Sequence, residues 1–207
     1  MEPGRLTEYR DWTIGISNEE MMSEMDDPRH WDNLGTMICF HHNYSLGDEH
    51  EWDVHDFKSY VDRGTRTGTL MALPLYLYDH SGITMSTVPF SCPWDSGQVG
   101  WIYVEKKDVL KEYNWKVLTA ERHAEVVRLL RSEVTIYDQH LRGEVYYYAI
   151  NDPEGELYDC CGGYYDTPDE IIAMCKESID DEINQRSVKA TARAIHTQRE
   201  ALLHTVR

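Results

Sequence analysis

Residues 144–170, EVYYYAINDPEGELYDCCGGYYDTPDE, decide the fold of the C-terminal part of the chain. Two runs rich in tyrosine, 144–150 and 156–165, flank Asn-Asp-Pro-Glu-Gly at 151–155, a composition that favours a turn. Thr-Pro-Asp-Glu follows at 167–170, which is a capping box with proline at the first helical position. The stretch therefore predicts a β-hairpin followed at once by a helix.

Toward the N-terminus, the clearest element is a helix over 120–141 that ends before Gly143. Apolar residues recur along it at helical spacing: Val126, Leu130, Val134, Tyr137 and Leu141. Before it we expect strands at 35–44, 70–78, 83–88 and 99–104, and helices at 52–63 and 105–113. Pro74 should push its strand toward a sheet edge or a bulge.

This order of elements predicts the fold class. Because short turns connect the strands, we expect an α+β fold in which a mainly antiparallel sheet packs with helices. A C-terminal β-hairpin should be followed by one or two helices. We expect a single α+β domain over 1–185 and a basic helical tail over 186–207.

The tail carries a weak apolar stripe, formed by Val188, Ala192, Ile195 and Leu202. Three outcomes are open for a helix of this kind. It extends as a separate arm, it frays, or it mediates self-association, so that a homo-oligomer through the C-terminal helices is one candidate assembly.

The net charge of −17 is concentrated in two blocks. Residues 1–60 hold 14 Asp and Glu against 4 Lys and Arg, and residues 151–185 hold 11 against 1. This balance argues against direct binding of nucleic acid or of an anionic membrane, since both need clustered cations. No apolar stretch is long enough to span a membrane. A basic protein partner, a divalent cation and plain solubility remain open.

The second acidic block coincides with the expected C-terminal helix, and it supplies a candidate binding surface for a cationic partner. Its members are Asp169, Glu170, Glu177, Asp180, Asp181 and Glu182. Several of these positions recur at helical spacing, opposite the isoleucines that would face the core. An exposed amphipathic helix with no partner would show a similar row.

A cluster of histidines and carboxylates near the N-terminus is a candidate metal site. Its members are His41, His42, Asp48, His50 and His55. Imidazole and carboxylate groups ligate divalent metals, which makes a metal the alternative to our expectation of no cofactor. However, His50 and His55 are five residues apart, about 140° around a helix, unlike the HExxH zinc motif. The alternative is a solvated acidic loop that leads into a helix N-terminus.

Cys92, His80 and Asp95 are candidate catalytic residues, acting as nucleophile, general base and orienting carboxylate. Pro93 counts against this hypothesis, because proline lacks the backbone N–H that often contributes to an oxyanion hole. The alternative is a packed loop in which the aspartate accepts hydrogen bonds from turn amides.

Five segments resemble a group of small proteins of phages and mobile elements of Gram-positive bacteria, to which no activity is assigned. They are LYLYDHSGITMST at 75–87, PFSCPWDSGQVGWIYV at 89–104, LGTM at 34–37, LGDEH at 46–50 and YDQHL at 137–141. The resemblance implies an accessory gene of a mobile element that acts in the cytoplasm of a bacterial host. It carries over no functional residue.

Context and charge together favour one function over two others. The leading hypothesis is a non-enzymatic, acidic inhibitor of a host defence nuclease of restriction or CRISPR type. Such an antirestriction or anti-CRISPR protein would act as a DNA mimic that occupies the cationic nucleic-acid site of its partner. The first alternative is a hydrolase or transferase that depends on Cys92 and His80 or on a metal in the region 41–55. The second is a structural or assembly protein whose basic tail docks onto an acidic block.

Overall fold

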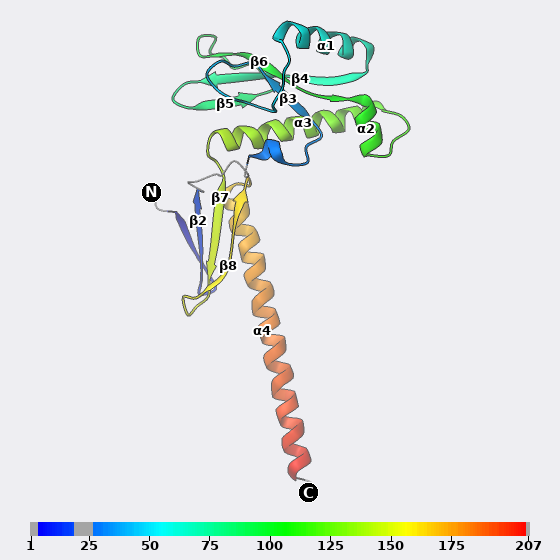
Figure 1. The fold of residues 1–207 in the computed structure, drawn as a ribbon. Helices are drawn as coiled ribbons and strands as arrows, with labels where there is room; N and C mark the ends of the chain where they lie inside the picture. Colours follow the sequence, from blue (N-terminus) through cyan, green and yellow to red (C-terminus); the bar gives the residue numbers. More distant parts are fainter. Residues whose placement is uncertain (1–3, 19–26, 206–207) are drawn as a thin grey trace. The chain divides into compact units, whose positions relative to one another are not determined.

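The computed structural model describes residues 4–18 and 27–205, and their contacts divide the chain into two compact units. Unit 1 comprises Met1–Glu19 and Val145–Arg207, and unit 2 comprises Glu20–Glu144 (Figure 1). We expected one domain over 1–185. The difference arises because strand β2 pairs with β7, which lies more than 120 residues later, so that unit 2 is inserted between two strands of unit 1.

Unit 1 is an antiparallel sheet covered on one face by a helix. Its strands are β1 (Arg5–Tyr9), β2 (Trp12–Asn18), β7 (Tyr146–Asn151) and β8 (Leu157–Tyr164), in the order β1-β2-β7-β8. Helix α4 (Pro168–Thr205) packs against β2 and β7. Its core consists of Trp12, Ile14, Ile16, Tyr148, Ile150, Ile171, Ile172, Cys175 and Ile179. The predicted hairpin is therefore confirmed as β7 and β8.

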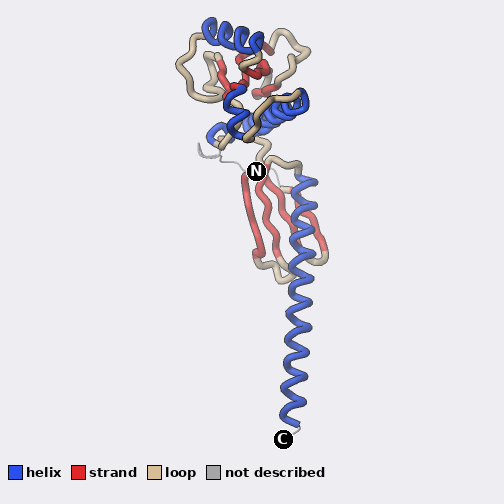
Figure 2. The backbone as a smooth tube through the Cα atoms, turned by 90° about the vertical axis from the view of Figure 1, so that its right-hand side faces the viewer, coloured by secondary structure: helices blue, strands red, loops and turns tan. Residues whose placement is uncertain are grey.

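The capping box at the start of α4 is present as predicted. The backbone N–H of Thr167 donates to Glu170 Oε2 at 2.9 Å, and the N–H of Glu170 donates to Thr167 Oγ1 at 3.4 Å. The hydrogen bonds that the Thr167 hydroxyl and the Thr167 N–H donate to the Glu170 carboxylate hold its pKa below the ordinary value. The helix then runs without a break past residue 185 and extends beyond the end of the sheet (Figure 2). The basic tail is thus helical through Thr205.

Unit 2 is built around a second antiparallel sheet, in the order β3-β6-β4-β5. Its strands are β3 (Thr36–Cys39), β4 (Leu70–Asp79), β5 (Ile83–Ser86) and β6 (Ser96–Glu105). Pro74 lies in β4, beyond the part of that strand that pairs with β5, and a register shift follows at Leu75/Tyr76. The proline therefore occupies a local edge next to a bulge, as expected.

Helices cover both faces of this sheet, α1 (Val54–Thr67) on one side and α3 (Ala120–Leu141) on the other (Figure 1). Phe57 and Val61 of α1 pack with Ile38, whereas Val126 and Leu130 of α3 belong to the larger cluster on the opposite face. A short helix, α2 (Lys106–Glu112), and a 3₁₀ turn, η2 (Pro28–His30), complete unit 2. The molecule is an α+β protein, as the sequence predicts.

Candidate functional site

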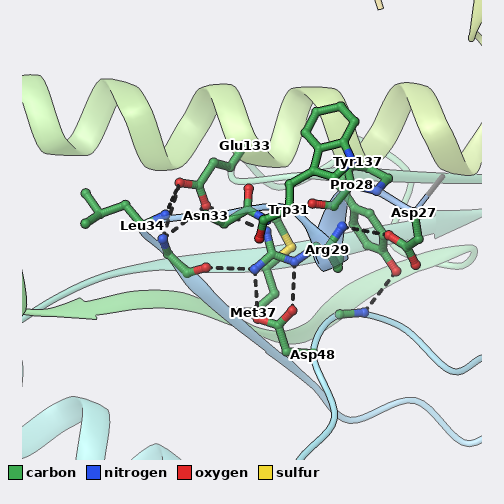
Figure 3. A network of polar contacts seen from close by, with 12 residues as sticks. Asp27, Pro28, Arg29, Trp31, Asn33, Leu34, Met37, Asp48, Glu133 and Tyr137 are labelled. Carbon is green, nitrogen blue, oxygen red and sulfur yellow. Dashed lines mark hydrogen bonds and ion pairs between the residues drawn. The ribbon is translucent and has the colours of Figure 1, made fainter. Parts of the chain in front are cut away.

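Asp48, one of the candidate metal ligands, is the partner of a buried arginine (Figure 3). The Arg29 side chain is only 4% exposed and donates from Nε and Nη2 to the two Asp48 carboxylate oxygens, at 3.0 and 2.7 Å. Asp48 Oδ2 also accepts the backbone N–H of Met37 at 2.7 Å. A bidentate pair of this kind satisfies the carboxylate with a protein cation. Asp48 therefore anchors its loop to β3.

The same arginine reaches α3, where Glu133 closes the network (Figure 3). Arg29 Nη1 lies 3.6 Å from Glu133 Oε2, and Glu133 accepts the backbone N–H groups of Leu34 and Gly35. Burial raises the pKa of Glu133, and the Gly35 N–H and the guanidinium oppose that rise. The network thus ties η2, β3, the loop before α1 and α3 into one framework.

The four candidate histidines lie in different surroundings. His50 Nε2 is 2.9 Å from the backbone oxygen of Cys39, and the His50 ring packs edge-on against Phe40. His41 stacks on His42, and His55 lies in the first turn of α1. Within residues 4–18 and 27–205, no three His, Cys, Asp or Glu side chains are grouped so as to hold a metal ion. The structure does not bring the five candidates together.

The stretch that contains His50 and His55 is the solvated acidic loop that the sequence analysis gave as the alternative to a metal site, and it continues into the first turn of α1. Residues 49–56, here called the acidic segment, include four exposed carboxylates: Glu49, Glu51, Asp53 and Asp56. Asp53 caps α1 by accepting the N–H groups of His55 and Asp56. The other three have no ion-pair partner among the described residues. Glu49 and Glu51 border an open hollow of about 600 Å³ lined mainly by residues 44–51.

Trp52 lies in the middle of the acidic segment. It is 42% exposed, and the buried part of its ring stacks on Tyr60 at 5.4 Å and contacts Phe57 at 5.3 Å between ring centroids. The ring is therefore held by the core under α1, while one side faces solvent. The run EHEWDVHD at 49–56 is the signal by which the sequence shows this combination of acid and anchored tryptophan.

Three of the six acidic residues expected to form a binding surface on α4 are paired with arginines of their own chain. Asp180 accepts the Tyr9 hydroxyl at 3.0 Å and pairs with Arg10 at 3.2 Å. Asp169 pairs with Arg5 and Glu182 with Arg186, while Glu170 accepts a hydrogen bond from the Thr167 hydroxyl and keeps its charge. Glu177 and Asp181 are exposed and have no ion-pair partner within the described residues. The six carboxylates do not form one free row.

Cys92, His80 and Asp95 do converge, but in the wrong order for a cysteine–histidine dyad. Cys92 Sγ lies 3.5 Å from Asp95 Oδ2, and His80 Nδ1 lies 3.6 Å from the same oxygen. The carboxylate therefore separates the thiol from the imidazole that should take its proton. The Asp95 backbone oxygen also accepts the N–H of Asp79 at 2.8 Å, and Ser96 donates to the Cys92 oxygen. These contacts are those of a hydrogen-bonded loop.

Trp94, in the same loop, is 91% exposed. Exposed tryptophans are enriched at protein interfaces, where they contribute large contact areas. The sequence also contains this tryptophan, between Cys92 and Asp95 of the candidate catalytic group.

Comparisons with known protein families, with curated proteins and with solved structures give no match. The described part of the chain contains no helix long and apolar enough to cross a membrane. The arrangement of the residues themselves must therefore support any functional assignment.

Proposed function

We propose that the protein is a non-catalytic inhibitor that binds the cationic nucleic-acid site of a host defence nuclease, of restriction or CRISPR type, in a bacterial cytoplasm. The observation that carries this proposal is the acidic segment, with four exposed carboxylates in eight residues around a half-exposed Trp52. The leading hypothesis from the sequence is kept, but its binding surface moves from α4 to residues 49–56.

The chemistry of this segment suits a cationic cleft. Duplex DNA carries one charge per about 1.7 Å, so a competitor must present carboxylates close together and free of internal cations. Glu49, Glu51 and Asp56 meet this condition within eight consecutive residues, whereas three of the six acidic residues of the α4 surface are paired with arginines. Charge steers the encounter, and an anchored tryptophan at the centre of the patch supplies apolar contact.

Plating efficiency tests the proposal in cells. Unmodified phage is plated on strains that carry a type I restriction system, a type II restriction system or Cas9, with and without the protein. We expect the protein to raise plating on at least one strain by about tenfold or more. The variant Glu49→Gln/Glu51→Gln/Asp56→Asn should lose this protection. Asp53 is left in place because it caps α1.

The matched control is Glu112→Gln/Glu121→Gln/Glu125→Gln, which removes the same number of exposed carboxylates from α2 and α3. It should protect as well as the unaltered protein. The proposal fails if no strain is protected, or if the two triple variants protect equally.

A further inference from the structure

One face of α4 is left uncovered by its own sheet from Met174 to Ile195. Ile171, Cys175 and Ile179 face the sheet, and Val188 lies nine residues after Ile179, about 180° around the helix. The residues on the side of Val188 are here called the outer face. They are Met174, Glu177, Asp181, Val188, Ala192 and Ile195, and all six are exposed.

The outer face is apolar where the helix has left the sheet. Arg186 still lies over the Trp12 ring of β2, and residues 187–205, here called the arm, follow it in the part of α4 that extends beyond the sheet (Figure 2). Val188 is 69% and Ile195 is 61% exposed. A helical segment of this length is only marginally stable in water without tertiary packing, and two exposed aliphatic side chains add to that cost. The arm is therefore a surface that needs a partner.

The spacing of the stripe indicates what kind of partner. Val188, Ala192 and Ile195 are separated by four and three residues, and the sequence continues the spacing at Arg199 and Leu202. Alternating steps of four and three are the a/d pattern by which two helices pack side by side. A charged residue at a seam position restricts the registers in which two helices can pack.

The charge of α4 selects the partner. Residues 168–185 carry six Asp and Glu against one Lys, and three of the six have no ion-pair partner among the described residues. Residues 186–207 carry five Lys and Arg against one Glu. Two copies of this helix attract each other when they run antiparallel and repel when they run parallel. In one antiparallel register Val188 faces Ala192 of the second copy. The same register places Asp181, which has no ion-pair partner among the described residues, opposite Arg199.

We propose that two copies of the protein form a dimer through the outer faces of their α4 helices, packed antiparallel with Asp181 of each copy opposite Arg199 of the other. The sheet of unit 1 lies on the opposite side of α4 and leaves this face accessible. The dimer does not depend on the acidic segment, which belongs to unit 2. Dimer formation and nuclease inhibition are therefore tested by different variants.

Sedimentation of the full chain under reducing conditions tests the dimer. We expect a concentration-dependent species of twice the 24.2 kDa chain mass. Val188→Asp/Ile195→Asp should shift it to the monomer, while Ala190→Asp/Thr197→Asp, which adds the same charge on the other side of the arm, should remain a dimer. A monomeric native chain up to about 100 µM, or an unchanged dimer in the first variant, would overturn the proposal.

Charge reversal tests the antiparallel orientation of the two helices. It also distinguishes the loss of a dimer contact from unfolding of the arm. Asp181→Arg should weaken the dimer by about tenfold, because it places like charges at both symmetry-related positions. Asp181→Arg/Arg199→Asp should restore it, since the pair is re-formed with opposite sign. In a parallel dimer the two copies of position 181 would face each other, so the double variant would still hold like charges together there. Failure of the double variant to recover would therefore exclude the antiparallel register.

Discussion

Arg29 joins three segments of unit 2 that are far apart in the chain. Its guanidinium is almost fully buried, pairs with Asp48 and Glu133, and donates to the backbone oxygen of Gly35. Removing one partner of a buried charge network leaves the other charges without compensation. We therefore predict that Arg29→Ala lowers the free energy of unfolding by about 3–5 kcal/mol. The exposed Arg63 of α1 provides the control, and Arg63→Ala should change stability by less than about 0.5 kcal/mol in the same urea titration.

Glu133 gives this network a pH dependence. Its pKa in the folded protein is raised by burial above the ordinary value of 4.5. A carboxyl of this kind favours folding most when protonated, and its contribution is lost as the pH rises through the folded pKa. The stability of the native chain relative to Glu133→Gln should therefore be greater at pH 4.5 than at pH 7. Equal differences in stability between the native chain and Glu133→Gln at pH 4.5 and pH 7 would show that folding does not raise the pKa of Glu133.

At the scale of elements, the parts of the fold that can be predicted are those that neighbouring residues determine. The hairpin β7–β8 and the start of α4 follow from turn and capping residues within 27 consecutive positions, so their sequence suffices. The pairing of β2 with β7 depends on residues more than 120 positions apart, and no local pattern encodes it. The candidate metal site could not be assessed from the sequence for the same reason, because its contacts join residues that are far apart in the chain. Asp48 looked like a metal ligand because its partner Arg29 lies 19 residues away.

The capping box makes a prediction for α4. Thr167→Ala removes the side-chain oxygen that accepts the Glu170 N–H, and a lost N-cap costs about 1 kcal/mol. We expect a loss of that size in the stability of unit 1, measured by thermal unfolding. Thr167→Ser keeps the acceptor and should retain most of the stability. If alanine and serine behaved alike, the cap would contribute little.

At the scale of the whole molecule, each unit has its own hydrophobic core. Unit 2 is continuous in sequence, and unit 1 is made from two separate stretches. We predict that a fragment of residues 27–144 folds alone, with cooperative urea unfolding and the near-ultraviolet circular dichroism of packed aromatic side chains. A fragment without a cooperative transition would show that unit 2 requires unit 1. The sequence suggested one domain because the strand that pairs with β2 lies in a distant stretch of the chain, which no local pattern reveals.

We propose that the protein acts by charge and not by thiol chemistry. Inhibition of plasmid cleavage by purified type I restriction enzyme and by Cas9 tests it most directly, with the native chain, Glu49→Gln/Glu51→Gln/Asp56→Asn and Cys92→Ser compared at low and high salt. We predict that the native chain and Cys92→Ser inhibit at least one of these nucleases equally, with an affinity that falls steeply as salt rises. The triple variant should bind about tenfold more weakly, with a shallower salt dependence. Loss of inhibition in Cys92→Ser, or full inhibition by the triple variant, would contradict the claim.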